Sequence, residues 1–415
     1  MLPKLDLAVT GSKRIFLQPK RRWLFFPLGL PGLLVVLAAS PWLRIRVGRL
    51  RSERIGHFVM NTWLTVLDEN MQQAPRKRSL DIWFAIPPIS NNQVYRMWCR
   101  KLRVWNYWFV EPVYLWLVAL KLQYFLLEPP NEDRDVHDHI HVSREPLVFT
   151  QEEEAKGLSL VKALTGNESG AKWVCLHNRD RQYLSTRTGN QNWSYHDYRD
   201  TPISDYVKCA ETLADLGYWV FRMGKVTQEP LVSSHPRVVD YANSEFRSDF
   251  ADVYLVAHCH FFLSSSSGVD ALATMFKRPQ IWVNLPNPFH PLIYKEDFIF
   301  TYKHFFDLET HRPLGLVDLH SRGAANFFRA RQFEAAGIGL QNQTPEEITQ
   351  VALQMHEELG DARVRIRNDR DPNQMAFWDA FPRIPEVHGS APFRARIGND
   401  FLASQPHLLI GPAHA

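Results

Sequence analysis

The stretch HFFLSSSSGVDAL, residues 260–272, most constrains the fold of this chain, because it joins a buried strand to a helix through a turn of small residues. The apolar run that ends at Leu263 predicts a strand, and apolar positions with helical spacing follow from Val269. Between them, four serines and Gly268 let a ligand approach the backbone closely. The N–H groups and the dipole at such a helix start favour an anion, such as a phosphate or diphosphate. A serine-rich turn with an ordinary N-cap explains the stretch equally well.

The patterns around this stretch alternate between strand and helix, which predicts an α/β fold with a doubly wound parallel sheet. With 415 residues, 45% of them hydrophobic and 22% charged, the chain is globular and long enough for two domains. The expected strands of the second domain are residues 172–179, 218–225, 237–242, 260–263 and 280–286, and its expected helices are residues 150–164, 204–216 and 248–257. Ligands of such sheets bind beyond the carboxyl ends of the strands.

Polar side chains follow the expected strands at those ends. Arginine or lysine follows each of the first three strands, and the serine-rich turn follows the fourth. Cations at three strand ends that face this turn indicate a phosphate-rich ligand, although each one alone is also explained as a solvated charge. The candidate residues are His177, Asn178, Arg179, Arg222, Lys225, Asn243, Arg247, Ser264, Ser265, Ser266, Ser267, Gly268 and Asp270.

Composition and motifs argue against two function classes. The chain has no GxxxxGK[ST] phosphate loop, which argues against a nucleoside triphosphatase. It has no recognised nucleic-acid-binding motif, and its net charge of +4 is mild and concentrated near the N-terminus. The four cysteines lack CxxC spacing, which indicates buried thiols in a reducing compartment such as the cytoplasm. They are Cys99, Cys175, Cys209 and Cys259.

Basic residues flank an uncharged apolar run near the N-terminus, residues 24–40. The run is slightly shorter than the roughly 20 residues that a membrane span needs, and it contains Pro27 and Pro31. Basic flanks on both sides disfavour translocation of either end. We therefore expect an in-plane or re-entrant anchor on the cytoplasmic face of a membrane, with peripheral contact through residues 13–54. A signal anchor and a buried core segment are the alternatives.

The following residues predict a first, smaller domain. Residues 43–50 and 81–88 read as strands, residues 58–67 as a helix, and residues 91–126 as a helix rich in aromatic side chains. A strand, a glycine turn at residues 51–57 and a helix are typical of the start of a Rossmann-like domain.

Two short patterns resemble metal sites but have simpler interpretations. His137, His139 and His141 alternate within residues 129–146, a polar, proline-flanked stretch, and in an extended segment they could reach a metal. A solvated linker is the better interpretation, because no fourth ligand is near. Residues 369–371 match the DxD pattern of some sugar-nucleotide enzymes, but their place before Pro372 indicates a turn. Residues 344–359, which lie between these two segments in the sequence, have the pattern of a capped helix.

With these residues in view, the chain resembles an uncharacterised bacterial family of glycosyltransferases found in gene clusters for cell-surface polysaccharides. The matching segments are RIRVGRLRSERIGHF, WVCLHNRDRQYL, SYHDYRD, GYWVFRMGK, DYANSEFRSDFADVYLVAHCHFFLSSSSGVDAL and TPEEI. More distantly, HNRD at residues 177–180 and the serine-rich helix start resemble the donor site of GT-B fucosyltransferases, where such elements hold a GDP-sugar. The two adjacent arginines of the fucosyltransferase pattern are not found at this position.

The resemblance implies a GT-B fold, in which two Rossmann-like domains face a cleft and a C-terminal helical tail crosses back. The implied parts are residues 1–42 as a basic, membrane-associating segment, 43–146 as the acceptor-side domain, 147–340 as the donor-binding domain and 341–415 as the tail. The implied enzyme moves a hexosyl or deoxyhexosyl group from a nucleotide-diphosphate sugar to a cell-surface glycan or lipid-linked acceptor. It acts at the inner face of the cell membrane, with no metal or other cofactor and no nucleic acid partner.

Within that function, Arg179, Arg222 and Lys225 are expected to stabilise the charge that develops on the leaving diphosphate. Glu53 and His57, in the loop that the resemblance places on the acceptor side, are candidate general bases if the anomeric configuration inverts. A hypothesis from another class is a non-catalytic, membrane-associated scaffold that keeps a nucleotide-sugar-binding fold.

Overall fold

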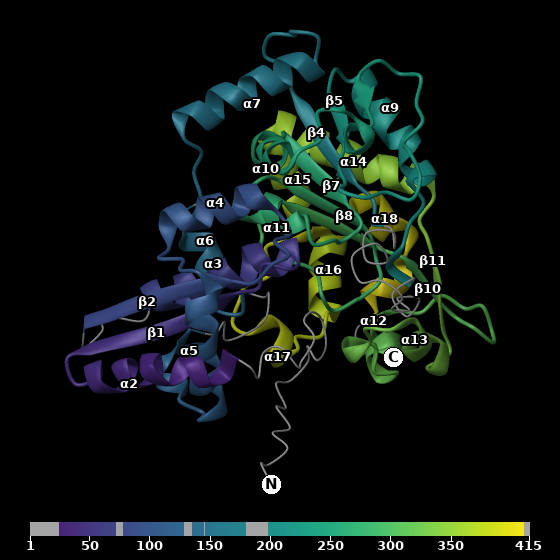
Figure 1. Cartoon of the computed structure of the whole chain (residues 1–415). Helices are drawn as coiled ribbons and strands as arrows, with labels where there is room; N and C mark the ends of the chain where they lie inside the picture. The colour runs from purple at the N-terminus through teal and green to yellow at the C-terminus, as the bar shows by residue number, and fades with distance from the viewer. Residues whose placement is uncertain (1–24, 72–77, 128–134, 145, 180–197, 411–415) are drawn as a thin grey trace. The chain divides into compact units, whose positions relative to one another are not determined.

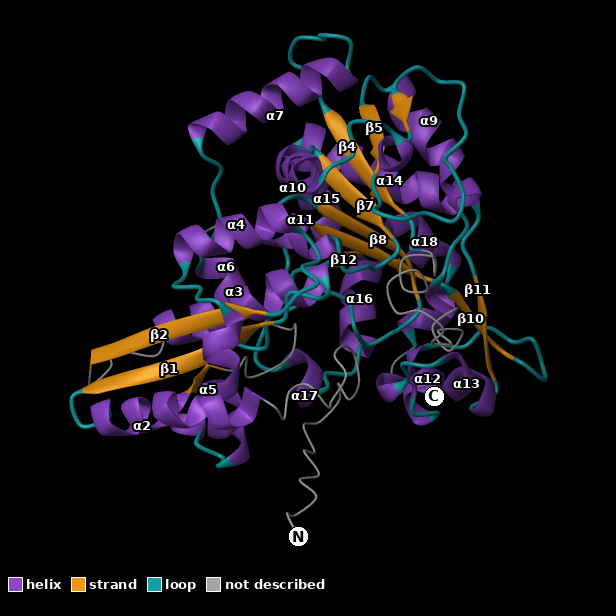
Figure 2. Cartoon of the chain, in the orientation of Figure 1, coloured by secondary structure: helices purple, strands orange, loops and turns teal. Residues whose placement is uncertain are grey.

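The computed structural model describes residues 25–71, 78–127, 135–144, 146–179 and 198–410 of the chain. The chain divides into two compact units, residues 1–133 (unit 1) and residues 134–415 (unit 2), and the division falls within the proline-flanked stretch noted above. Each unit contains helices and a parallel sheet (Figures 1 and 2). The α/β class expected from the sequence is therefore confirmed.

Unit 1 is built on a three-stranded parallel sheet of order β2-β1-β3. Its elements are η1 (Phe26–Gly29), α2 (Leu30–Ala39), β1 (Leu43–Leu50), α3 (Ile55–Met71), β2 (Arg78–Ala85), α4 (Asn92–Lys101), α5 (Tyr107–Ala119), η2 (Gln123–Phe125) and β3 (Leu126–Leu127). Both expected strands are confirmed, and the second lies three residues earlier than expected. The chain adds β2 on one side of β1 and β3 on the other. The turn that follows β1 therefore lies at the point where the strand order of this sheet reverses.

Two expectations for unit 1 are wrong in whole or in part. The single helix expected over residues 91–126 is broken into α4 and α5, because the side chain of Asn106 caps α5 by accepting the Trp108 N–H at 3.0 Å. Val104, between the two helices, forms a parallel bridge to Trp83 of β2. The expected turn between the first strand and its helix is present at residues 52–54, but Gly56 lies outside it, in the first turn of α3.

The apolar run near the N-terminus packs on one side only. Leu33 and Val36 of α2 are buried in the core of unit 1. Gly29 allows η1 to approach α5 closely, because a Cβ atom at this position would lie 2.4 Å from the backbone of Pro112 in α5. The opposite side of η1 and α2 is exposed. Among the residues that the structure describes, no helix has the length and apolar character needed to cross a membrane.

Unit 2 is built on a seven-stranded parallel sheet of order β12-β9-β8-β7-β4-β5-β6. Its strands are β4 (Trp173–His177), β5 (Trp219–Arg222), β6 (Val238–Val239), β7 (Phe261–Ser264), β8 (Gln280–Leu285), β9 (Phe298–Tyr302) and β12 (Arg396–Ile397), while β10 (His304–Asp307) and β11 (Ile338–Gln341) form a separate antiparallel pair. All five expected strands are confirmed, although the third is reduced to two residues.

The helices of unit 2 complete the α/β pattern. They are α6 (His139–Val142), α7 (Gln151–Leu164), η4 (Ile203–Tyr206), α9 (Val207–Asp215), η5 (Tyr241–Asn243), α10 (Asp249–His258), α11 (Asp270–Met275), α12 (Leu316–Ser321), η6 (Ala324–Asn326), α13 (Ala330–Ala335), α14 (Pro345–Gly360), α15 (Ala362–Asp369), α16 (Pro372–Ala380), α17 (Pro385–His388), α18 (Asn399–Ser404) and η7 (Pro406–Leu409). The helices expected at residues 150–164, 204–216, 248–257 and 344–359 are confirmed. Asp371 caps α16, so the DxD pattern is a turn between two helices, as expected.

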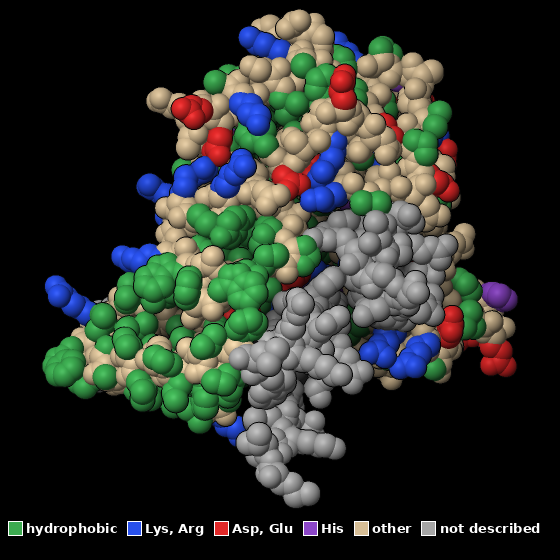
Figure 3. All heavy atoms as spheres, in the orientation of Figure 1, with side chains coloured by type: hydrophobic (Ala, Val, Ile, Leu, Met, Phe, Trp, Pro, Cys, Tyr) green, Lys and Arg blue, Asp and Glu red, His purple; other side chains and the backbone are tan. Residues whose placement is uncertain are grey.

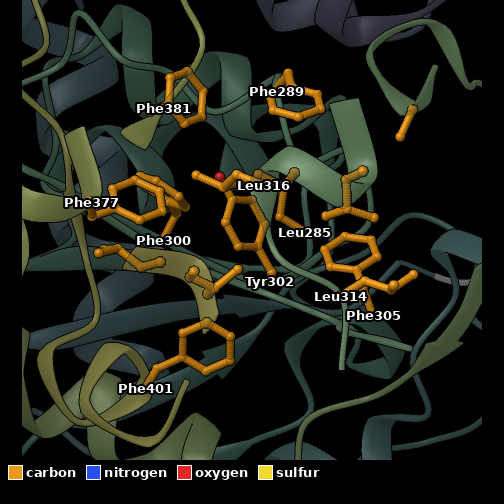
Figure 4. Packing of buried hydrophobic residues seen from close by; sticks show 14 of the residues in the cluster. Leu285, Phe289, Phe300, Tyr302, Phe305, Leu314, Leu316, Phe377, Phe381 and Phe401 are labelled. Atoms are coloured by element: carbon orange, nitrogen blue, oxygen red, sulfur yellow. The ribbon is translucent and has the colours of Figure 1, made fainter. Parts of the chain in front are cut away.

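Residues beyond 341 are part of the unit 2 core. Ile348 and Met355 of α14 pack in one buried cluster with residues of β4, β5, β7 and β8. In a second cluster, Phe377 and Phe401 pack around Tyr302 of β9 (Figure 4). Because β12 also pairs with β9, this segment supplies both a strand and core side chains.

Two smaller expectations are also corrected. His139 and His141 lie in α6, so they do not alternate along an extended segment. Cys99 on α4 is exposed, whereas Cys175, Cys209 and Cys259 are buried thiols, as expected.

Candidate functional site

The candidate site lies where the chain reverses its direction across the unit 2 sheet. From β4 the chain adds β5 and β6 on one side, and it then returns to the other side of β4 with β7, β8 and β9. Such a switch point leaves a crevice outside the carboxyl ends of the two central strands, and ligands of doubly wound sheets bind there. His177, the last residue of β4, is paired with Ser264, the last residue of β7. The serine-rich turn therefore starts at the switch point.

Hydrogen bonds hold the serine-rich turn in one conformation. The Ser265 hydroxyl accepts the Arg179 backbone N–H at 2.8 Å, and the Ser264 hydroxyl accepts the Ser266 N–H at 3.2 Å. Ser266 has a φ of 60°, which is a left-handed conformation. This conformation is energetically unfavourable for every residue except glycine, and it is frequent at functional sites. The Ser266 carbonyl oxygen accepts a hydrogen bond from the Arg199 guanidinium at 2.9 Å.

The start of α11 is occupied by a carboxylate from its own first turn. Asp270 accepts the backbone N–H of Ser267 at 2.5 Å, so the expectation of an open N–H group is wrong at Ser267. The Ser267 hydroxyl also donates to Asp270, at 3.4 Å. Burial raises the pKa of Asp270 to about 7, against the opposing effect of these hydrogen bonds. The carboxyl group can therefore change charge near neutral pH.

A buried arginine lies at the end of β5, next to the end of β4. Arg222, at the end of β5, is 1% exposed, and its guanidinium donates to Asn178 Oδ1 at 3.3 Å and to Asp240 Oδ1 at 3.4 Å. Both distances are long for charge-assisted hydrogen bonds. His177 is 3.2 Å from the Ser267 hydroxyl through Nδ1. Its burial, and next the nearby charge of Arg222, lower its pKa to about 3, so the imidazole is neutral at physiological pH.

Arg179 lies at the same edge of the sheet. Its charge contributes to the lowered pKa of His177, and its guanidinium is 4.0 Å from the Asp200 carboxylate. Thr201 donates its backbone N–H to the Arg179 carbonyl at 3.2 Å. The Thr201 hydroxyl is 3.2 Å from that of Ser265. Residues 180–197, which include Asp180 and the first half of YHDYRD (residues 195–200), lie outside the described residues.

Two of the expected cations pair with carboxylates at the start of α10. Lys225 donates to Asp249 at 3.0 Å. Arg247 donates to Asp252 at 2.7 Å and to Asp249 at 3.2 Å. The structure therefore groups Arg179, Arg222, His177, Asn178 and the residues of the serine-rich turn, whereas Lys225 and Arg247 belong to this second ionic group. Asn243, which also follows β6, donates to Asp240 at 2.7 Å.

The candidate bases of unit 1 lie after β1, at the reversal of its sheet. Glu53 forms an ion pair with Arg49. His57, in the first turn of α3, is 3.1 Å from Asn61 Oδ1 through Nδ1.

Two residues of the site were missed by reasoning from the sequence. Arg199 belongs to the SYHDYRD segment quoted above, but its contact with Ser266 joins residues far apart in the chain. Lys303 directly follows β9, is 5% exposed and donates to the Asp200 carbonyl at 3.3 Å. Burial lowers its pKa to about 8. The apolar run FIFTY before Lys303 could have revealed another strand that ends in a cation.

Among the described residues, no group of three or more His, Cys, Asp or Glu side chains is arranged to hold a metal ion. The donors that the candidate site offers are cationic and neutral nitrogens and hydroxyl groups, which suit an anionic ligand rich in oxygen.

Comparison with known proteins gives structural similarities but no sequence match. No protein-family model matches the chain, and no curated protein matches it. The chain is similar to the glycosyl transferase family 9 structure from Veillonella parvula DSM 2008, with 14% identity, a TM-score of 0.42, and coverage of 76% of this chain and 97% of that one. It is also similar to the Escherichia coli ADP-heptose lipopolysaccharide heptosyltransferase II, with 10% identity, a TM-score of 0.36, and coverage of 62% and 90%. A third similarity is to the dodecameric iron-containing heptosyltransferase TibC in complex with ADP-D-β-D-heptose, with 13% identity, a TM-score of 0.39, and coverage of 77% and 78%.

Proposed function

We propose that the protein is a glycosyltransferase that binds a nucleotide-diphosphate sugar at the switch point of unit 2. One observation carries the proposal: Arg222, Arg179, His177 and the serine-rich turn meet at the carboxyl ends of β4, β5 and β7. This is the position at which doubly wound sheets bind nucleotides, and its side chains match a diphosphate.

The arginines have a direct role in the proposed reaction. As the glycosidic bond to the donor breaks, negative charge develops on the leaving diphosphate, and cations already in place stabilise it. Arg222 is suited to this role, because its buried guanidinium lies at the ends of β4 and β5, where the diphosphate of the donor would bind. Arg179 supplies a second positive charge at the same strand ends.

The neutral groups hold and orient the donor. His177 is a neutral hydrogen-bonding group at physiological pH, so it can orient the donor by a hydrogen bond without adding a positive charge. Asp270 can receive a proton near neutral pH, and an arriving diphosphate favours that protonated form. The serine hydroxyls complete a polar wall around the phosphates.

The finer parts of the proposal concern the sugar and the acceptor. We propose a hexosyl or deoxyhexosyl donor, with GDP-sugars among the candidates, and a cell-surface glycan or lipid-linked acceptor at the inner face of the cell membrane. The GT-B arrangement, the acceptor role of unit 1 and a base function for Glu53 or His57 stay predictions, as does independence from metal ions.

A thermal-shift screen of the full-length protein against UDP-, GDP-, ADP-, CMP- and dTDP-sugars tests the donor site without an acceptor. A ligand that binds only the folded state at about 100 times its Kd stabilises that state by about 2.7 kcal/mol, so at least one donor should raise the Tm measurably. Arg222→Ala should abolish the shift. Arg237→Ala is the matched control, because Arg237 pairs with Glu168 away from the switch point.

Turnover separates the proposed enzyme from the scaffold alternative. A transferase should hydrolyse its bound donor slowly and release the nucleotide diphosphate, whereas a scaffold would bind the donor and leave it intact. If no member of the panel shifts the Tm, the donor site itself is wrong.

A further inference from the structure

Unit 1 carries a large exposed surface that is apolar and nearly free of charge. It is formed by η1, α2, the residues that follow α2, and α5, and in Figure 3 the hydrophobic side chains gather over this part of the molecule. We name it the apolar face of unit 1. Six large side chains on it are each more than half exposed: Leu28, Leu34, Val35, Trp42, Trp108 and Phe109. Exposed apolar surfaces of this extent usually mark an interaction site.

The two helical segments form one surface. The ring of Phe25, which precedes η1, lies 5.3 Å from that of Trp108 in α5. Gly32 of α2 packs closely on Val113 of α5, since a Cβ at Gly32 would lie 2.5 Å from Val113 Cγ2. Across residues 25–43 and 104–120, Glu111 is the one charged residue in the sequence, and it is half buried. The face therefore offers apolar contact over two packed helices.

The shape of the segment suits contact within the plane of a membrane. A ten-residue helix such as α2 is about 15 Å long, roughly half the thickness of the hydrocarbon core of a bilayer. After α2 the chain enters β1, and after α5 it reaches β3, so both helices stay attached to the sheet of unit 1. Exposed tryptophans such as Trp42 and Trp108 favour the boundary between headgroups and acyl chains.

The distribution of charge favours a lipid surface over a second copy of the chain. Residues 1–133 contain 19 Lys and Arg against 9 Asp and Glu, a net charge of +10, although the whole chain carries only +4. A unit with this charge is attracted to anionic headgroups. Two copies meeting through the same face would bring two strongly basic units together, which their repulsion opposes.

We propose that the apolar face of unit 1 inserts into the headgroup region of an anionic lipid bilayer and lies in its plane. The bilayer is thus the partner of this surface. The proposal locates the membrane contact on two helices, η1/α2 and α5, rather than on the N-terminal segment alone. It gives the membrane association proposed for the transferase a defined contact surface and does not depend on the donor site in unit 2.

Vesicle flotation of the full-length protein tests the proposal. The protein should float with vesicles of phosphatidylcholine and phosphatidylglycerol, bind less to phosphatidylcholine alone, and lose part of its binding at raised salt. The double substitution Leu34→Gln with Phe109→Gln should weaken binding by at least about tenfold, because it removes two apolar side chains from the contact. Both side chains are exposed, at 58% and 78%, so the fold should persist, and an unchanged Tm verifies this.

The matched control is Val232→Gln with Met375→Gln, which removes two exposed apolar side chains, at 75% and 61%, from unit 2. This variant should float like the wild type. Absence of flotation of the wild type, or equal flotation of the Leu34/Phe109 variant, overturns the proposal. So does a concentration-dependent dimer that the Leu34/Phe109 substitutions dissociate while vesicles capture no protein. Nucleotide-sugar thermal shifts report on unit 2, so failure of the donor site is distinguishable from failure of this surface.

Discussion

The backbone N–H of Ser267 donates to the carboxylate of Asp270 at 2.5 Å, directly at the proposed diphosphate position. Ionised Asp270 competes with a phosphate for this N–H and also repels the phosphate by its charge. Protonated Asp270 competes less strongly and carries no charge that repels the phosphate. Because burial raises the pKa of Asp270 to about 7, the charge of the site changes within the physiological range.

The first prediction is that donor affinity falls as the pH rises through about 7, by up to about tenfold per pH unit for one coupled proton. Titration calorimetry with the nucleotide sugar found in the thermal-shift screen measures this, since the phosphates of such a donor have no proton to lose near neutral pH. Asp270→Asn should make the profile flat. Asp215→Asn, an exposed carboxylate of the same unit, should leave the slope intact. Equal slopes for wild type and Asp270→Asn contradict the assignment.

The second prediction concerns stability. The unfolded chain loses the proton of Asp270 near about pH 4, whereas the folded protein keeps it up to about pH 7, because the pKa is raised in the folded state. The stability that protonated Asp270 contributes is therefore lost as the pH rises from about 4 to about 7. Asp270→Asn should be more stable than wild type above about pH 7, by up to about 4 kcal/mol, and this gain should shrink toward about pH 4. Urea denaturation at several pH values measures the difference, and a gain independent of pH would rule out titration as its cause.

The third prediction concerns turnover. Arg222→Ala should reduce sugar transfer, or donor hydrolysis in the absence of acceptor, by about two to three orders of magnitude, because the diphosphate loses a preplaced cation. Arg237→Ala, at the pair with Glu168, should retain wild-type rates. Because Arg222 is buried, the Tm of the variant must be measured alongside. Near-normal turnover in a folded variant would remove Arg222 from the mechanism.

The fourth prediction concerns unit 1. Gly29→Ala places a Cβ 2.4 Å from the backbone of Pro112, so the two helical segments must move apart. Overpacking of this kind should lower the free energy of unfolding by about 1 to 3 kcal/mol, measured by urea denaturation with tryptophan fluorescence. Gly360→Ala adds a Cβ with no heavy atom within 4 Å and should change stability by no more than about 0.5 kcal/mol. Equal stability of the two variants would show that the close approach at Gly29 is unimportant.

Much of the fold follows from local patterns in the sequence. Strands such as β7 and β8 are short apolar runs bounded by turns, and α14 begins at a capping box formed by Thr344 and Glu347, so each is encoded within a few residues. The break between α4 and α5 depends on one asparagine cap inside a long apolar pattern, where periodicity favours continuous helix.

The candidate site was predictable in outline, because parallel strands place the residues after them at one edge of the sheet. The position after a strand correctly predicted Arg179, Arg222 and the serine-rich turn. It does not predict that Asp249 and Asp252 pair with Arg247, or that Arg199 contacts Ser266, because these pairings depend on tertiary contacts.

The pairing of β12 with β9, and the packing of α14 against the sheet, set an order for folding during synthesis. The core of unit 2 needs side chains from Val174 to beyond Ile397, so it cannot close until the residues that follow Ile397 have left the ribosome. Unit 1 is contiguous in sequence and ends at residue 133, so its sheet can form much earlier. A nascent chain would therefore present a folded, basic unit 1 while unit 2, which contains the proposed donor site, is still being made.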